Sequence, residues 1–383
     1  MNFALSEEQQ MMQDSLNRLL QKSYSFEHRK EFQKSTDGWS RDLWRQYAEM
    51  GLLALPFDEH DGGLSGTPVE TMIVMEQLGR AITLEPYIAT VVLAGGIIRH
   101  AGSDGQKQRL IEKIIDGSTV LTLAHQEEQA RYDLASVGTT AKLVDGAWQL
   151  NGRKSFTLHA DSANMLVVSA RVSGNTTDKD GIALFLLDAN NAGVRIEGYR
   201  THDGQRAASV TLASAIVGAD GIIGTPGKMY PVLERVSQEA IAALCAEAVG
   251  VMAELHEATV DYLKQRRQFG VPIGSFQVLQ HRAAEMYMAL EQARSMAMFA
   301  TIMSNDEDER ARAQAISAAK VQIGRSGKLI GEQAVQLHGG IAIAMEYKAG
   351  HYFKKLTMLD QMLGDADHHL ELLSQGGSLF EKA

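Results

Sequence analysis

Residues 265–281 read QRRQFGVPIGSFQVLQH, a turn of glycine and proline between two segments of helical spacing. Arg266, Gln268 and Phe269 stand together where the first segment ends. A guanidinium can donate two hydrogen bonds to phosphate oxygens, an amide can hydrogen-bond the polar edge of a base, and an aromatic ring can stack on a base. These three residues therefore suit a dinucleotide ligand. The same residues also describe a cationic helix end followed by a loop with a packed phenylalanine.

A second stretch, EQAVQLHGG at residues 332–340, ends another helical segment with Gln336 and the pair Gly339 and Gly340. Paired glycines let a backbone approach a pyrophosphate without a side-chain collision, although glycine also commonly caps a helix. Neither stretch is a GxGxxG motif that follows a strand, so the sequence does not support a Rossmann nicotinamide site.

The composition is that of a globular protein of two or three domains. The chain has 383 residues, of which 45% are apolar and 22% charged, and only 6 are proline, so long helices are expected. Its 37 basic and 47 acidic residues give a net charge of −10, which disfavours nucleic acid as a partner.

The only cysteine, Cys245, cannot form an internal disulfide, so we expect a cytoplasmic protein. The start, MNFALSEEQQ, carries early acids and no long apolar core, so we expect neither a signal peptide nor a membrane span.

The spacing of apolar residues changes twice along the chain. Residues 1–118 contain amphipathic helical segments, and residues 119–225 contain short runs rich in β-branched residues. Residues 226–383 return to helical spacing, with helices expected near 229–265, 276–304, 308–338 and 344–372. We therefore expect a mainly α protein with a central β domain, and a ligand site where the domains meet.

Six segments resemble, in their order and in their amino-acid sequence, segments of the acyl-CoA dehydrogenase family. They are LPFDEHDGGL (55–64), EQLGR (76–80), GSDGQKQRLIEKIIDGS (102–118), LNGRKSF (150–156), RRQFGVPIGSFQVLQH (266–281) and QLHGG (336–340). The resemblance covers essentially the whole chain. It implies an N-terminal helical domain, a β-barrel-like middle domain and a C-terminal four-helix bundle, usually in dimers or tetramers. The implied activity is FAD-dependent α,β-dehydrogenation of an acyl-CoA thioester, with an electron acceptor such as an electron-transfer flavoprotein.

The resemblance also implies which residues contact FAD. Arg266, Gln268 and Phe269 match family positions that contact the FAD of a neighbouring subunit. Gln336 through Gly340 match another such contact, so oligomerisation would complete the site.

A further implied flavin contact lies in the β domain, where Phe156 matches a usually aromatic position beside the flavin ring. The family's earlier flavin motif, Thr-Glu-Pro followed by Gly-Ser-Asp, is replaced here by HQEEQARYDLAS. Contacts from His125 to Arg131 are therefore not carried over from the family.

The proton acceptor of the family reaction is missing from both places where the family carries it. In most members it is a Glu before Gly-Thr, some two dozen residues after the paired glycines, and Leu363 stands at that place. In other members it lies on the first bundle helix, at a position that matches Ala240. Neither side chain accepts a proton.

Three other carboxylates are candidates for this base. Glu247 lies seven residues after Ala240 on nearly the same helix face, within the apolar run LCAEAVGVM. Burial there would raise its pKa, which suits a base and equally suits a hydrogen-bonded core residue. Glu239 precedes Ala240 and points about 100° around the helix from it. Asp365 follows two residues after Leu363.

The stretch MLGDADHH, residues 362–369, holds two aspartates and two histidines. Adjacent side chains diverge on a helix, and only Asp365 with His368 or His369 has the spacing of converging ligands. We therefore expect no metal site, and we expect Asp365 to begin the last helix.

The segments HYFKKLTMLDQMLGDADHHL and FEHRKEF resemble a subgroup that includes the small subunit of pimeloyl-CoA dehydrogenase. Members of that subgroup pair with a larger subunit. Three functions stay open: an acyl-CoA dehydrogenase in a homo-oligomer or heteromer, a base-deficient structural or flavin-sharing subunit of a heteromer, and a flavin oxygenase or oxidase on the same fold.

Overall fold

The computed structural model describes residues 5–375 and divides into two compact units. Unit 1 comprises Met1–Lys30, Pro68–Thr83 and Ile241–Ala383, and unit 2 comprises Glu31–Thr67 and Leu84–Ala240. Each unit therefore draws on segments that are far apart in the sequence. The three domains expected from the spacing of apolar residues, 1–118, 119–225 and 226–383, stay predictions, because these two units group the chain differently.

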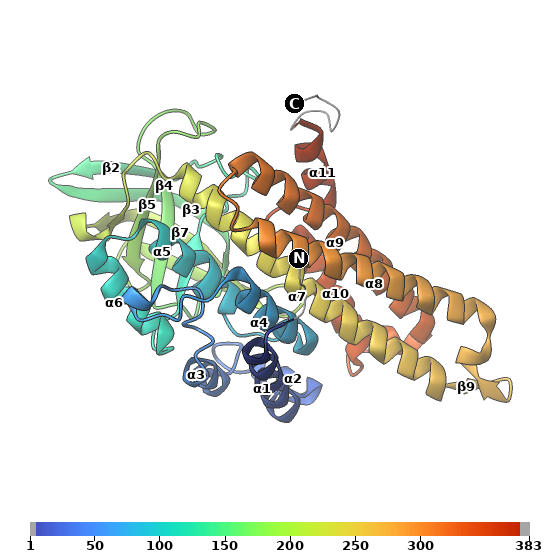
Figure 1. The fold of residues 1–383 in the computed structure, drawn as a ribbon. Coiled ribbons are helices and arrows are strands. Elements are labelled where there is room, and N and C mark those ends of the chain that lie inside the picture. Colours follow the sequence, from blue (N-terminus) through green and yellow to red (C-terminus); the bar gives the residue numbers. More distant parts are fainter. Residues whose placement is uncertain (1–4, 376–383) are drawn as a thin grey trace. The chain divides into compact units, whose positions relative to one another are not determined.

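Unit 1 is helical apart from one small hairpin (Figure 1). Its elements are α1 (Glu7–Ser23), most of α2 (Phe26–Phe32), α4 (Pro68–Ala81), the C-terminal part of α7 (Tyr230–Gln265), β9 (Arg267–Gln268), β10 (Val271–Pro272), α8 (Gln277–Met303), α9 (Glu309–His338), α10 (Lys348–Gln361) and α11 (Ala366–Gln375). Helix α9 is central, because it packs against α8, α10 and α11. Its start is fixed by Asp308, whose side chain accepts from the backbone N–H groups of Arg310 and Ala311.

The last expected helix, residues 344–372, is broken into α10 and α11. Leu363 and Gly364 have positive φ values of 56° and 105°, which a continuous helix does not allow. The apolar spacing continues across this break, so the periodicity alone did not reveal it.

Unit 2 combines short helices with an eight-stranded sheet. Its helices are α3 (Arg41–Glu49), a π-helical segment (Ile88–Ala94), α5 (Gly95–Ala101), α6 (Asp104–Ile115) and the N-terminal part of α7, up to Ala240. Its strands are β1 (Leu121–Ala124), β2 (Thr140–Val144), β3 (Ala147–Leu158), β4 (Met165–Arg171), β5 (Ile182–Asp188), β6 (Val194–Arg200), β7 (Arg206–Val217) and β8 (Ile222–Ile223). The strand order is β6-β7-β3-β2-β4-β5-β8, and β1 pairs with β4. Leu150, Leu166, Phe185 and Val210 are fully buried in the core of this sheet.

Helix α7 is the longest helix among residues 5–375, and an 18-residue window of it has a mean hydropathy of 1.4. Its length and composition would allow it to cross a membrane. However, 94% of this window is buried within the protein, as in the core helix of a globular fold. The structure thus confirms a mainly α protein with a central sheet.

Candidate functional site

The β9–β10 hairpin at the end of α7 carries the first cofactor segment expected from the sequence. Gln268 pairs with Val271, which leaves Phe269 and Gly270 as a two-residue turn with φ values of 53° and 82°. A type I′ turn requires positive φ at both central residues, and a bulky side chain adopts it only at a conformational cost. Phe269 is nevertheless 91% exposed. The hairpin therefore holds an aromatic ring in an open position.

Arg266, just before the hairpin, has a fixed backbone and a side chain available to a ligand. Its N–H donates to the carbonyl of Tyr262 at 2.8 Å, and its carbonyl accepts from the N–H of Ile273 at 2.8 Å. Among residues 5–375, its guanidinium makes no hydrogen bond or ion pair. The amide of Gln268 donates to the carbonyl of Arg267 at 2.7 Å. The five N–H donors of Arg266 can therefore serve an anion.

The paired glycines lie at the open end of α9. Gly339 caps the helix with φ 65°, a conformation that favours glycine. A Cβ built on Gly339 or Gly340 would meet no atom within 4 Å. Gln336 is also exposed, one turn earlier on α9. The backbone here is therefore accessible to a ligand from outside unit 1, and packing within the unit does not explain why both residues are glycine.

A cluster of three aromatic rings joins these two segments within unit 1. The ring of Tyr262 lies 4.6 Å from that of His338, and His338 lies 5.2 Å from Tyr347, measured between ring centroids. Tyr262 is one turn before Arg266, and His338 directly precedes Gly339. These rings could not be predicted as a cluster from the sequence, because nothing in their spacing along the chain indicates that they meet.

The two segments fit the pyrophosphate and adenine part of FAD. An anion needs hydrogen-bond donors, and the guanidinium of Arg266 has no partner among residues 5–375. A pyrophosphate also needs a backbone without side chains, which Gly339 and Gly340 present. An exposed ring such as that of Phe269 can cover a base. These contacts stay predictions.

Phe156, the expected flavin-side residue, lies on β3 in unit 2 and is half-buried. It forms an isolated bridge with Gln126, just after β1. The altered motif from His125 to Arg131 is thus held against β3 by backbone pairing.

A buried ion pair reinforces this contact. The Nζ of Lys154 donates to Glu127 at 2.7 Å and to the hydroxyl of Ser169 at 3.0 Å. Glu127 also accepts from the backbone N–H groups of Gly138 and Thr139, at 2.8 and 3.0 Å. Burial raises the pKa of Glu127, but the charge of Lys154 and the hydrogen bonds from Lys154, Thr139 and Gln129 outweigh it and lower that pKa to about 2. Glu127 is therefore an ionised structural carboxylate.

Glu247, the first candidate base, forms a buried ion pair within unit 1. Its Oε1 lies 2.6 Å from the Nζ of Lys355 on α10, and the two side chains are 6% and 2% exposed. The backbone around Glu247 is also tightly packed, since a Cβ on Gly79 would lie 2.1 Å from its carbonyl oxygen. The carboxylate thus has a structural partner that ties α7 to α10.

Glu239, the second candidate, is surrounded by three basic groups of unit 2. Its carboxylate lies 2.5 Å from Nη2 of Arg99, 2.9 Å from Nε2 of His100 and 3.0 Å from Nε of Arg235. Burial raises the pKa of this carboxyl, but the hydrogen bonds and positive charges prevail and lower it to about 2. Such a carboxylate is a weak proton acceptor near neutral pH.

Asp365, the third candidate, caps α11. Its Oδ1 accepts from the backbone N–H of His368 at 2.8 Å, and α11 begins at Ala366. In the described part of the chain, no group of three or more His, Cys, Asp or Glu residues is arranged to hold a metal ion.

The two positions where the family carries its base are apolar and well defined. Ala240 is fully buried. Leu363 is half-buried and has left-handed backbone geometry, with φ 56°. Its carbonyl lies 3.0 Å from Nε2 of His369, whose Nδ1 lies 3.1 Å from the hydroxyl of Ser317. The backbone at Leu363 is therefore held in place although its side chain cannot take a proton.

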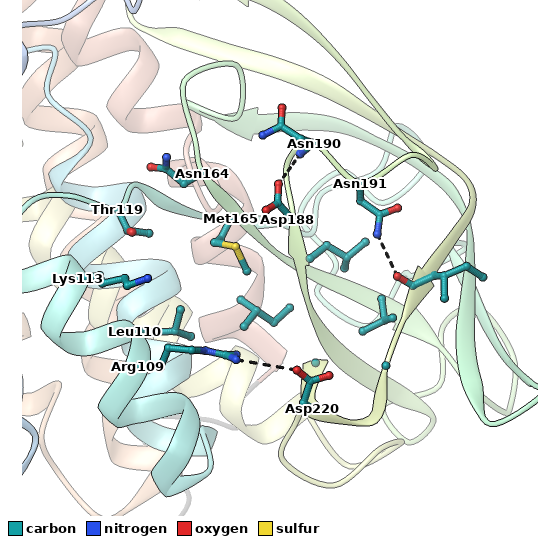
Figure 2. Close-up of a pocket in the computed structure, with 16 residues that line it drawn as sticks. Arg109, Leu110, Lys113, Thr119, Asn164, Met165, Asp188, Asn190, Asn191 and Asp220 are labelled. Atoms are coloured by element: carbon teal, nitrogen blue, oxygen red, sulfur yellow. Dashed lines mark hydrogen bonds and ion pairs between the residues drawn. The ribbon is translucent and has the colours of Figure 1, made fainter.

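A pocket of about 480 Å³ opens in unit 2, lined by α6 and by the ends of β4, β5 and β7 (Figure 2). Arg109 on its rim lies 3.9 Å from Asp220, and Asn191 donates to the carbonyl of Ile216 at 3.0 Å. Some of the polar groups around the pocket therefore pair with one another. None of the residues that line this pocket is among the predicted site residues.

Comparison with known proteins identifies the family. The models of the N-terminal, middle and C-terminal domains of acyl-CoA dehydrogenases match residues 6–118, 122–214 and 229–377. These matches span most of the chain, which therefore belongs to the acyl-CoA dehydrogenase family. The resemblance found in the sequence is thus confirmed.

Individual relatives are distant but match almost the full length. Acyl-CoA dehydrogenase IpdE2 of Mycolicibacterium smegmatis is 27% identical over 372 residues, which cover 96% of this chain and 98% of that protein. The structure of the Tcur3481-Tcur3483 steroid ACAD is 28% identical, with a TM-score of 0.86 and 97% of each chain covered. Butyryl-CoA dehydrogenase from Megasphaera elsdenii shares the fold, with a TM-score of 0.89 at 21% identity over 98% of this chain and 99% of that chain.

Proposed function

We propose that this chain takes part in FAD-dependent α,β-dehydrogenation of an acyl-CoA thioester, as a subunit of an oligomer. The observation that carries the proposal is the open half-site of Arg266, Phe269, Gly339 and Gly340. Among residues 5–375 the Arg266 guanidinium makes no hydrogen bond or ion pair, Phe269 is exposed, and a Cβ on either glycine would meet no atom within 4 Å. Membership of the family supports the same reaction class.

In this reaction a carboxylate removes the α-proton of the thioester while the β-hydrogen leaves as hydride. When bound, FAD supplies the acceptor for that hydride. The two electrons then pass to an acceptor such as an electron-transfer flavoprotein. Arg266 would neutralise charge on the pyrophosphate, the glycine pair would let the backbone approach it, and Phe156 would form part of the wall beside the flavin.

The outer face of α8 supports an oligomer. Val278, Met288 and Phe299 are 60%, 57% and 43% exposed. At 100° per residue they share a sector of about 80°. Ala289 and Ala293, which are buried within unit 1, lie about 20° and 60° beyond Val278 on the adjoining side of the helix. Large apolar side chains that are exposed beside the buried face of a helix favour a covering partner, so we propose that a second subunit packs here.

A specific observation favours a heteromer as the second candidate. Both family base positions are apolar, at Ala240 and Leu363. Glu247 and Glu239 are engaged in ion pairs, and Asp365 caps a helix. A larger acyl-CoA dehydrogenase subunit would then supply the base, and this chain would share the flavin site. The name of the Tcur3481-Tcur3483 steroid ACAD likewise joins two proteins.

The test compares the chain purified alone with the assembly that co-purifies with it from its native cell. Both are examined for visible flavin absorption and for anaerobic bleaching by a short, a medium and an ω-carboxylated acyl-CoA. Bleaching by the chain alone supports a self-sufficient dehydrogenase, and bleaching only by the assembly supports the heteromer. Well-folded material that is colourless and takes up no added FAD would overturn the proposal. Flavin turnover with oxygen but without CoA dependence would instead indicate an oxidase or oxygenase.

A further inference from the structure

Strand β3 contains a bulge at Ser155 and Phe156, the residue expected to face the flavin. Lys154 pairs with Val210 and Thr157 pairs with Ala208, so three steps along β3 oppose two steps along β7. The extra residue interrupts the ladder and leaves backbone groups that need other partners. Bulges are frequent beside active sites because they re-aim a side chain.

The backbone of Ser155 is held from both sides of the bulge. Its N–H donates to the carbonyl of Gln126 at 2.9 Å. Its carbonyl accepts from the phenolic hydroxyl of Tyr199 at 2.8 Å and from the hydroxyl of Ser209 at 3.3 Å. Two side chains thus replace the ladder partner that the bulge removes.

Tyr199 and Ser209 come from the strands on the far side of the bulge. Tyr199 lies on β6, the edge strand, opposite Ala207, and Ser209 lies on β7 opposite Glu197. Burial raises the pKa of Tyr199, so its hydroxyl remains a donor at neutral pH. The phenol spans from the sheet edge to β3.

The ends of the bulged segment are also anchored. Lys154 directly precedes the bulge, and Glu127 directly follows Gln126, which pairs with Phe156. The buried ion pair between Lys154 and Glu127 therefore fixes the two backbone segments that flank Phe156.

We propose that Tyr199 and Ser209 are positioning residues that hold this bulge and so set the place of Phe156 beside the flavin. The role toward the flavin rests on the proposed function, whereas the role toward the bulge does not. The two hydroxyls act on Phe156 only through the carbonyl of Ser155.

The test compares Tyr199→Phe, Ser209→Ala and the double variant with Tyr230→Phe, a matched control. Tyr230 also lies in unit 2, and its hydroxyl donates to Glu234 at 3.0 Å within one turn of α7. One experiment measures hydrogen exchange of the backbone amides of Ser155 and Phe156 in the protein without added flavin. A second titrates FAD and records the visible flavin spectrum.

Loss of the Tyr199 hydroxyl is expected to speed exchange at the bulge by about fivefold, with a larger effect in the double variant. In the FAD titration it is expected to raise Kd by about fivefold and to shift the flavin spectrum. Tyr230→Phe should change neither. Unchanged exchange would overturn the bulge role. Faster exchange with an unchanged FAD Kd and an unchanged flavin spectrum would overturn the role toward the flavin. If the wild-type protein takes up no FAD, the proposed function and the flavin role fall together, and exchange still decides the role at the bulge.

Discussion

The Nζ of Lys355 lies 2.6 Å from Oε1 of Glu247, and both side chains are buried. Removing one partner of a buried ion pair leaves an uncompensated charge and costs about 3–5 kcal/mol. We therefore expect Glu247→Gln to lower the free energy of unfolding by about 3 kcal/mol, measured by denaturant titration. Adding Lys355→Met to this variant should restore part of the loss, because both charges are then absent.

The same variant tests Glu247 as the base, which stays a prediction. If Glu247→Gln kept wild-type stability and FAD content but lost anaerobic bleaching, the carboxylate would act in catalysis. A loss of stability with bleaching retained in the folded fraction would remove it from the candidates.

The ion pairs of Glu239 predict a dependence of stability on pH. The pKa of this carboxyl falls from its ordinary 4.5 to about 2 in the folded protein, so the charged form is stabilised by folding. Its contribution is complete above pH 4.5 and is lost as the pH falls toward 2. The difference in unfolding free energy between the wild type and Glu239→Gln should therefore shrink over that range. A difference that is constant from neutral pH down to the acid limit would contradict this.

Arg266→Ala is expected to weaken FAD binding by about 10- to 100-fold, because it removes a charge-assisted pair of hydrogen bonds. The measurement is the FAD content per subunit and the Kd from titration. Lys264→Ala is the matched control, since that ammonium lies 3.9 Å from Asp261 and its side chain is 72% exposed. Equal loss in both variants would argue for a general charge effect instead of a contact.

The place of Leu363 predicts that a base can be installed there. Its backbone is already fixed by the contact between its carbonyl and His369, and its side chain is half-buried, so a longer side chain can reach solvent. If the wild-type chain alone does not bleach with acyl-CoA, Leu363→Glu should do so, and Leu363→Gln should not. Bleaching by the Gln variant would show that the proton leaves by another route.

Local features could be predicted from the sequence because they depend on neighbouring residues. The turn at Phe269 and Gly270, the helix end at Gly339 and the cap at Asp365 were each visible in a few letters. The partners of the carboxylates could not be predicted in this way. Arg99 and Glu239 are 140 residues apart in the chain, and no local pattern indicates that they meet.

Of two breaks in regular structure, one could not be predicted from the sequence and the other only in part. The strand bulge at Ser155 has no glycine to mark it, and its partners Tyr199 and Ser209 come from other strands. The break after α10 was indicated only by Asp365, which was expected to begin the last helix. The apolar spacing continues across Leu363 and Gly364, whose backbone angles mark the break. In both places, tertiary contacts decide the conformation.

If a second subunit covers the exposed apolar side chains of α8, as we propose, the survival of this polypeptide in the cell depends on that subunit. A freshly synthesised copy left single would expose Val278, Met288 and Phe299 to water, chaperones and proteases. Its abundance should then follow the supply of its companion, so that deleting the companion's gene depletes this protein without changing its messenger RNA.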